Sequence, residues 1–321
     1  MATKVFIIHA KSMEIRKQHI GKFTDLLDKA KIDYEYIDEY EPGVITQGDI
    51  QTKVQLTKNN TGDIFDELVR NMHVNQLSNT LKHGCALEKA KDNKDKYAYF
   101  LFVEDDILFG DDVMQKLAEV TVAFQNSDSD ILFLGLPSLS PIENKDIVKI
   151  CPTTTFYKLF PCCDSYMIKS SNIEKIVGGF YPIKFVNNFQ LSYVVSKNNF
   201  NTSMSLPNIF LDGSKYGAFL SSVDSNNRMM FNPEFIQLTN LLQSEKHDDK
   251  TIESAFDTIK FKNHPDVMHL NAIYLITRGE FKKASTLLDN ILQISTQNNC
   301  IVNSETEFLK TYMRLYRFIQ E

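Results

Sequence analysis

The stretch YAYFLFVEDDILF, Tyr97–Phe109, decides the fold class of this chain. Apolar and aromatic residues run without helical spacing from Tyr97 to Val103, which predicts a strand buried on both faces. Three carboxylates, Glu104–Asp106, follow directly at the carboxyl end of this strand. Ligands of open α/β sheets bind beyond the carboxyl ends of the strands, so we expect a binding site at these acids.

The adjacent acids Glu104–Asp106 need positive charge nearby, because like charges repel and an unpaired buried charge is costly. A hard divalent ion such as Mg²⁺ or Mn²⁺ takes one or two protein carboxylates and leaves positions for phosphate oxygens. The alternative is that acids begin the next helix, where the helix dipole favours them. We assign that role to Asp111 and Asp112, just before the helical segment Val113–Phe124, and favour a metal with a nucleotide-phosphate substrate for Glu104–Asp106.

The composition is that of an ordinary soluble globular protein. With 321 residues, 43% of them hydrophobic, the chain can form two domains with substantial cores. The net charge of −6 and the lack of a dense Lys/Arg run argue against a nucleic-acid partner, which needs a basic surface. Neither a signal peptide nor an apolar run of ~18 residues is present, so we expect a cytoplasmic protein without a transmembrane helix. The cysteine pattern fits a reducing compartment and resembles no zinc site.

The N-terminal segments predict a β-α-β unit, as in nucleotide-binding α/β folds. Lys4–His9 predicts a buried strand, Ser12–Lys29 a helix and Asp33–Ile37 a second strand. Neither a dinucleotide-binding loop nor a P-loop follows the first strand. The polar segment Glu41–Gly62 predicts a loop that could cover a site.

Further elements are predicted on both sides of the acidic strand. Gly62–Asp92 has helical periodicity, and Ser170–Val177 predicts a short helix ended by Gly178 and Gly179. Alternating or apolar runs predict further strands at Asp130–Gly135, Thr155–Leu159 and Ser165–Ile168.

Beyond Pro233 helical periodicity replaces the strand patterns, which places a domain boundary within Ser221–Pro233. We expect an α/β domain at 1–228 and an all-α domain at 229–321. In the latter, His269–Leu292 resembles a tetratricopeptide-type helix pair around Gly279. Helices around Ile252–Ile259 and Glu305–Ile319 would flank this pair.

Five segments follow one another along the chain: VFIIH with Arg16 downstream, a helix with Ser78 and His83, FLFVEDDILF, DILFLG and SYMIKSSNIEKIV. Their order and spacing resemble glycosyltransferase family 25, the lipopolysaccharide and collagen galactosyltransferase family. The resemblance covers roughly residues 4–225. It implies a GT-A fold with a mixed central sheet and a Mn²⁺ or Mg²⁺ ion. It also implies a nucleotide diphosphate sugar as donor, and among these donors a UDP-sugar is favoured.

The resemblance also implies roles for the acidic residues. Glu104 and Asp106 would be at the metal, with Asp106 the direct ligand, while Asp105 would contact the ribose or the water molecules on the metal. The ion would bridge the two donor phosphates and neutralise the charge that grows on the leaving diphosphate.

Basic and polar residues near the first strand would bind the nucleotide. His9, Lys11 and Arg16 lie at or after the end of the first strand, where the family binds base and ribose and where a cation could meet phosphate. Solvated surface positions are the alternative for Lys11 and Arg16. The helical His83 would face the donor pocket with Lys82 or Ser78, and the alternative for His83 is a structural, hydrogen-bonded histidine.

Two further aspartates are candidates for catalysis. An inverting transfer needs a carboxylate base near the acceptor hydroxyl, and Asp164 is one candidate. Asp212 could be a metal ligand or an acceptor contact, with an ordinary Asp-Gly turn as the alternative. Where the family carries an acidic P-x-D position, this chain has Pro182 and then the amides Asn187 and Asn188, which cannot act as a base.

The leading hypothesis is a metal-dependent, inverting glycosyltransferase that moves galactose or glucose to a hydroxyl group on a glycan, lipopolysaccharide or protein. The alternative is an inactive transferase-like domain that serves, with its helical repeat, as a protein-interaction module. The C-terminal helices could also hold a homodimer or bind a protein partner.

Overall fold

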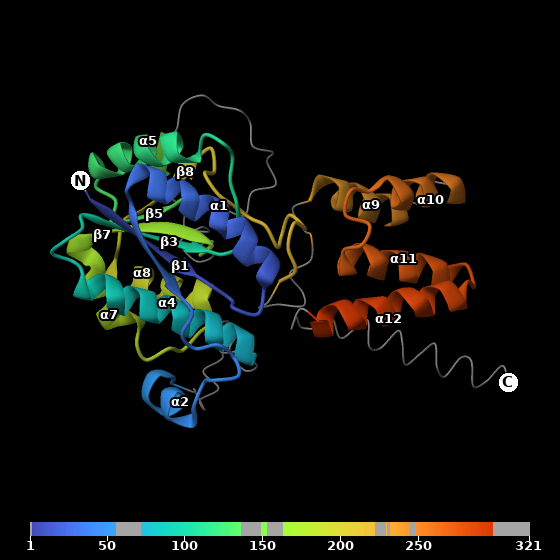
Figure 1. The fold of residues 1–321 in the computed structure, drawn as a ribbon, viewed down its shortest axis with the longest axis horizontal. Helices are drawn as coiled ribbons and strands as arrows, with labels where there is room; N and C mark the ends of the chain where they lie inside the picture. The colour runs from blue at the N-terminus through green and yellow to red at the C-terminus, as the bar shows by residue number, and fades with distance from the viewer. Residues whose placement is uncertain are drawn as a thin grey trace. The chain divides into compact units, whose positions relative to one another are not determined.

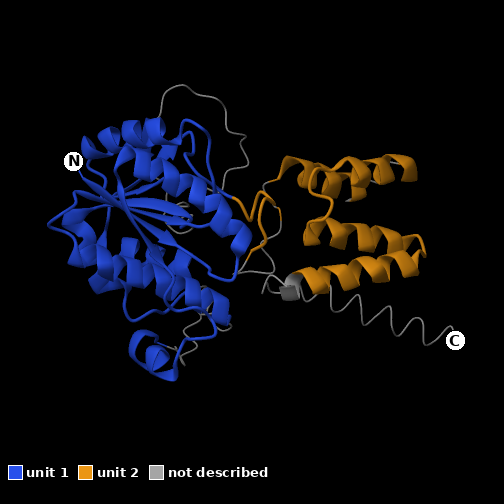
Figure 2. Ribbon diagram, in the orientation of Figure 1, with its two compact units in different colours: residues 1–212 blue, residues 213–321 orange. Residues whose placement is uncertain are grey.

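The computed structural model describes residues 2–55, 72–135, 149–152, 163–221, 229, 232–243 and 248–297. The chain separates into two compact units, Met1–Asp212 and Gly213–Glu321 (Figure 2). Each unit has hydrophobic clusters of its own. The division into domains 1–228 and 229–321 stays a prediction, and the candidate site lies in the first unit.

A mixed sheet forms the centre of the first unit. In the described part of the chain it has seven strands in the spatial order β2 (Asp33–Ile37), β1 (Thr3–Ile8), β3 (Tyr99–Glu104), β7 (Ser165–Lys169), β5 (Ile131–Phe133), β8 (Thr202–Leu206) and β6 (Lys149–Pro152). Strand β1 is parallel to β2 and β3, and β8 is parallel to β5. Strand β7 is antiparallel to β3 and β5, and β6 is antiparallel to β8.

Helices cover both faces of this sheet (Figure 1). One face carries α1 (Glu14–Ala30) and α5 (Val113–Gln125), and the other carries α4 (Val74–Asp92), α7 (Ile173–Phe180) and α8 (Asn187–Asn198).

Strand β3 is buried on both faces, as its apolar run predicts. Phe100 and Phe102 belong to the core under α4, α7 and α8, whereas Leu101 and Val103 belong to the core under α1 and α5. Because successive side chains of a strand point to opposite faces, a strand between two helical layers must be apolar at every position.

Most predicted elements of the first unit are confirmed, with bounds shifted by a few residues. The predicted strands at Lys4–His9, Asp33–Ile37, Asp130–Gly135 and Ser165–Ile168 are β1, β2, β5 and β7. The helical run before the acidic strand is α4, which begins at Val74, and residues 56–71 lie outside the described part. The predicted strand Thr155–Leu159 also lies outside it.

Two local predictions are wrong. The segment Glu41–Gly62 is not only loop, because α2 (Gln47–Lys53) forms within it. A capping box starts this helix: Thr46 Oγ1 accepts from the Asp49 N–H at 3.1 Å, and Asp49 Oδ2 accepts from the Thr46 N–H at 2.9 Å. Helix α7 continues through Gly178 and Gly179, because Phe180 is buried on the same core-facing side as the start of the helix.

In the described part of the second unit, the regular elements are helices. Its helices are α9 (Pro233–Gln243), α10 (Asp249–Thr258), α11 (Pro265–Thr277) and α12 (Phe281–Gln297). Helices α11 and α12 form the predicted pair around Gly279, whose φ of 74° favours glycine. Their relationship to the tetratricopeptide repeat stays a prediction, and Glu305–Ile319 lies outside the described residues.

None of the described helices is both long enough and apolar enough to span a membrane.

Candidate functional site

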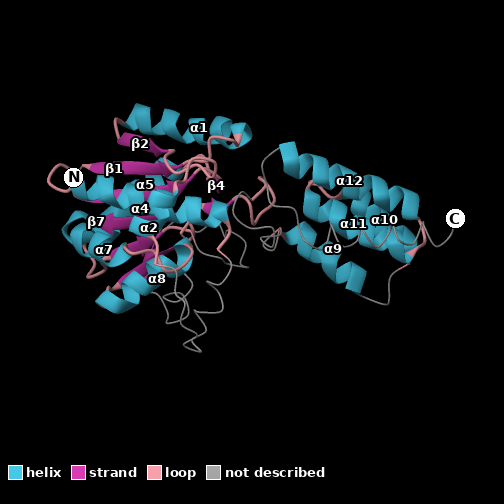
Figure 3. Cartoon of the chain, turned by 90° about the horizontal axis from the view of Figure 1, so that it is seen from below, coloured by secondary structure: helices cyan, strands magenta, loops and turns pink. Residues whose placement is uncertain are grey.

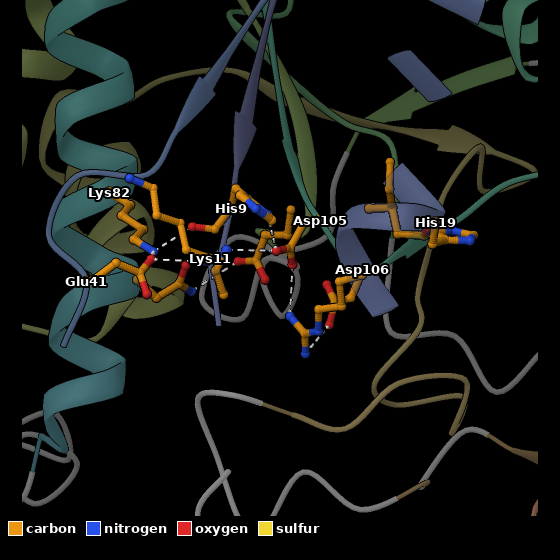
Figure 4. A network of polar contacts seen from close by, with 12 residues as sticks. His9, Lys11, His19, Glu41, Lys82, Asp105 and Asp106 are labelled. Carbon is orange, nitrogen blue, oxygen red and sulfur yellow. Dashed lines mark hydrogen bonds and ion pairs between the residues drawn. The ribbon is translucent and has the colours of Figure 1, made fainter. Parts of the chain in front are cut away.

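The candidate site lies where β1, β2 and β3 end together. Ile8 is level with Ile37 on β2 and with Glu104 on β3, so the residues that follow these strands meet at one edge of the sheet. Two of the three acids are buried there, with Asp105 2% and Asp106 4% exposed. Figure 4 shows Asp105 beside His9, with Asp106 next to it.

Arg16 supplies positive charge to the buried acids. It lies in the first turn of α1 and is 4% exposed. Its Nη1 is 2.9 Å from Asp105 Oδ1, and its Nη2 is 3.1 Å from Asp106 Oδ2. The solvated-surface alternative is therefore wrong for Arg16: the guanidinium group is a buried partner of both carboxylates.

Asp105 is held from several sides at once. Besides Arg16, the His9 Nδ1 lies 2.9 Å and the Ala10 N–H donor 2.7 Å from Asp105 Oδ2. Burial works to raise the pKa of Asp105, but the Arg16 charge and these hydrogen bonds outweigh it and hold the pKa below its usual range. Asp105 is therefore an ionised anchor between the end of β1 and α1.

Asp106 has a different electrostatic environment. Burial raises its pKa to about 7, against the opposing attraction of Arg16, and repulsion from Asp212, Glu104 and Asp105 adds to the rise. Asp106 thus lies close to three other carboxylates as well as to the Arg16 guanidinium group.

Asp212 comes to this site from far along the chain. The short strands β4 (Ile107–Leu108) and β9 (Leu211–Asp212) are antiparallel, and Ile107 is paired with Asp212. His19 of α1 also contacts this pair, since its Nε2 lies 2.7 Å from the carbonyl oxygen of Ile107. The pairing brings Asp212 next to the acidic end of β3, although Gly213 does follow it in a turn.

Glu104 points to the opposite face of the sheet from Asp105 and is held by α4. Asn79 Nδ2 donates to Glu104 Oε1 at 3.1 Å, and His83 Nε2 lies 3.2 Å from the same oxygen. His83 is fully buried, and its Nδ1 lies 3.0 Å from the Tyr166 hydroxyl of β7. His83 is therefore a hydrogen-bonded link between Glu104 and Tyr166.

Sequence reasoning did not select Asn79 or Tyr166 as site residues. A signal for Asn79 was present, because it precedes His83 by four positions and so lies on the same helix face.

Other predicted binding residues contact the chain after β2 instead of the acids. Lys82 is buried and its Nζ donates to the His9 carbonyl oxygen at 2.6 Å and to Glu41 Oε1. Ser78 Oγ donates to the Tyr40 carbonyl oxygen at 2.6 Å. Lys11 is mostly exposed and pairs with Asp38 at 2.9 Å. Lys82 and Ser78 thus tie α4 to the segments after β1 and β2, and Lys11 links these two segments to each other. A ligand-binding role for Lys11, Ser78 and Lys82 stays a prediction.

Asp164 lies at the acidic edge, directly before β7. It is 6% exposed, and its carbonyl oxygen accepts from the Glu104 N–H at 2.8 Å. Backbone pairing therefore places the predicted base beside the acidic residues, on the neighbouring strand.

No ready-made metal cage accompanies these acids. Among the described residues, no group of three or more His, Cys, Asp or Glu side chains is arranged to hold a metal ion. Any ion here would have to take one or two carboxylates and complete its coordination with water or ligand oxygens, which is the usual habit of Mg²⁺.

Comparisons with known proteins add little to this geometry. No protein-family model matches the sequence, and a search of curated proteins finds no match. Among solved structures, the crystal structure of a glycosyltransferase involved in the glycosylation of the major capsid of PBCV-1 matches with a TM-score of 0.31 and 7% sequence identity. The match covers 54% of this chain and 62% of that chain, less than two thirds of its length. The function is therefore a proposal that rests on the sequence resemblance and the site.

Proposed function

We propose that this chain is a glycosyltransferase of the GT-A type that uses a divalent metal ion to move a hexose from a nucleotide diphosphate sugar to a hydroxyl acceptor. The observation that carries the proposal is the charge around Asp106. This carboxylate is buried at the carboxyl edge of a mixed α/β sheet, where Asp212, Glu104 and Asp105 add negative charge beside Arg16.

The carboxylates around Asp106 are of the kind that a hard divalent ion would take as ligands. Asp106 and Asp212 offer carboxylate oxygens from two adjoining short segments, and their mutual repulsion would be relieved by a cation. Asp106 would be the direct ligand, with Asp212 or Glu104 as the second carboxylate. When bound, the ion would neutralise the negative charge of the leaving diphosphate.

The predicted binding residues near the ends of β1 and β2 would position the nucleotide. Asp105 holds Arg16 and His9 in place, so its role would be to orient these two side chains at the end of β1. Arg16 would present its guanidinium group to Asp106 and to donor phosphate, a geometry to which its planar donors are suited. Lys82 and Ser78 would shape the nucleotide pocket by holding the segment after β2.

The base that accepts the acceptor proton would be a carboxylate at the same edge. Asp164 remains the candidate, because it lies beside Glu104 through the backbone hydrogen bond between β3 and β7. In this assignment the transfer is inverting, and no covalent sugar–protein intermediate forms.

A thermal-shift titration tests the proposal directly. Wild-type protein is titrated with UDP, UDP-glucose, UDP-galactose and other nucleotide diphosphates, each with and without Mn²⁺. A ligand at ~100 times its dissociation constant should stabilise the native state by ~2.7 kcal/mol. We expect one nucleotide to stabilise the protein only with Mn²⁺, and Asp106→Asn to abolish the effect.

The matched control is Asp111→Asn, which removes an exposed acid in the turn before α5. It should leave the metal-dependent shift unchanged. Absence of a shift with every nucleotide, or an equal loss in both variants, would contradict the proposal.

A second candidate, a protein-interaction module, is favoured by the helical second unit. A cavity of about 420 Å³ lies between α9 and α10, with Leu238, Leu241 and Ile259 among its lining residues. Wild-type protein that binds no nucleotide in the titration above would favour this candidate.

A further inference from the structure

We propose that the Asn187 side chain binds a sugar hydroxyl group, on the donor hexose or on the acceptor, at the sheet edge that carries Glu104. This inference rests on the proposed glycosyl transfer and extends it to a residue whose amide is unsuited to act as a base.

The Asn187 amide is buried without a partner. Asn187 is 4% exposed, and neither its Nδ2 nor its Oδ1 has a hydrogen-bond partner in the described part of the chain. Buried polar groups are nearly always hydrogen-bonded, and leaving one unsatisfied destabilises the fold. An unpaired amide at this position lowers the stability of the fold, so we infer that its role is to bind a ligand.

Gln190, one turn later on α8, shows how the fold treats a structural amide. Its Oε1 accepts from the N–H groups of Lys184 and Phe185 at 2.9 and 3.1 Å, and its Nε2 donates to the Phe180 carbonyl oxygen at 2.5 Å. Every polar atom of this buried side chain is thus used to hold the turn before α8. The Asn187 side chain is also buried, but its polar atoms make no hydrogen bond in the described chain.

The topology brings Asn187 to the candidate site. Helix α8 precedes β8, which runs parallel to β5 and, through β7, in the same direction as β3. A helix that packs back along its following strand begins at the carboxyl edge of the sheet, so Asn187 lies at the edge where Glu104 ends β3. Both α8 and α4 cover the sheet face on which Glu104 and Tyr166 lie, and His83 of α4 contacts both of these residues.

The chemistry of the orphan amide selects a hydroxyl group. A carboxamide offers two N–H donors and one carbonyl acceptor, and both ends of Asn187 are unsatisfied. Phosphate oxygens would satisfy only the donors, and a metal ion only the acceptor. Neighbouring sugar hydroxyls donate and accept at once, so they can satisfy both ends.

The test compares Asn187→Ala with Asn188→Ala, since Asn188 is the adjacent but exposed amide. Isothermal titration calorimetry with UDP, UDP-glucose and UDP-galactose in the presence of Mn²⁺ measures donor binding. If Asn187 contacts the donor hexose, Asn187→Ala should weaken binding of one UDP-hexose about tenfold while binding of UDP is unchanged. If it contacts the acceptor, both affinities should stay, and transfer to methyl β-galactoside or methyl β-glucoside should fall about tenfold.

The melting temperature separates this role from a structural one. Because the Asn187 side chain makes no hydrogen bond within the described chain, Asn187→Ala should melt within about 2 °C of wild type or above it. A lower melting temperature, or binding and transfer equal to those of Asn188→Ala, would overturn the inference.

The role of Asn187 can be tested separately if the proposed transferase function is wrong. If wild-type protein binds no nucleotide, saturation-transfer NMR with methyl β-galactoside and methyl β-glucoside tests Asn187 alone. Contact with a glycoside that Asn187→Ala loses would support the hydroxyl site. Absence of contact in the wild type would overturn it.

Discussion

Arg16 is the residue on which the candidate site depends most. Its guanidinium group joins two carboxylates that follow β3, and all three side chains are nearly fully buried. Removing one partner of a buried ion pair leaves uncompensated charge in a place that water does not reach.

We therefore expect Arg16→Met to destabilise the fold by about 3–5 kcal/mol, the usual cost of breaking a buried pair. Methionine keeps much of the side-chain length, so the loss reports charge more than volume. Urea unfolding measures the change. The control is Lys11→Met, which removes an exposed cation paired with Asp38 and should change stability little. An equal effect of the two substitutions would contradict the assignment.

Helix α4 contacts both Glu104 and the segment after β2. On one of its faces it packs closely against Tyr181. Gly84 follows His83, and a Cβ built there would lie 2.9 Å from Tyr181 Cζ and closer still to the Tyr181 hydroxyl. Helix α1 offers the opposite case, because a Cβ at Gly21 would meet nothing within 4 Å.

These two helix-interior glycines predict opposite results for one substitution. Gly21→Ala should stabilise the protein by about 0.5–1 kcal/mol, the ordinary helix propensity difference. Gly84→Ala should destabilise it by about 1–3 kcal/mol, because Tyr181 must move out of a packed position. Thermal unfolding of both variants checks the pair, and stabilisation by Gly84→Ala would show that Tyr181 is not held there.

For the whole molecule, the described hydrophobic clusters are divided between the two units. The two clusters on either side of the sheet take residues only from the first unit, and those of α9–α12 only from the second. Cores that share no residues can unfold in separate transitions.

Scanning calorimetry should therefore resolve two transitions that respond to different substitutions. Phe102→Ala should lower the first unit's stability by about 3–5 kcal/mol, and Leu288→Ala that of the second by about 2–5 kcal/mol, since both side chains are fully buried. Each variant is the control for the other. A single transition lowered by both would mean that the units unfold together.

The elements near the site could be predicted from the amino-acid sequence. An apolar run that ends in Glu104–Asp106 predicted a strand buried on both faces with acids at its carboxyl end, and β3 confirms this. Such local patterns are predictable because periodicity records which faces of an element meet the core. The capping box of α2 was missed because its two residues lie within a polar segment rich in turn formers.

The partners of the acids, in contrast, follow from how the chain packs in space. Arg16 and Asp105 are 89 positions apart, and Asp212 reaches Ile107 through the pairing of β9 with β4. Packing also decides that Asn187 is buried and Asn188 exposed, although the two amides are adjacent and chemically identical. Charge pairing and burial depend on distances through space, which the packing of helices and strands sets and which spacing along the chain does not record.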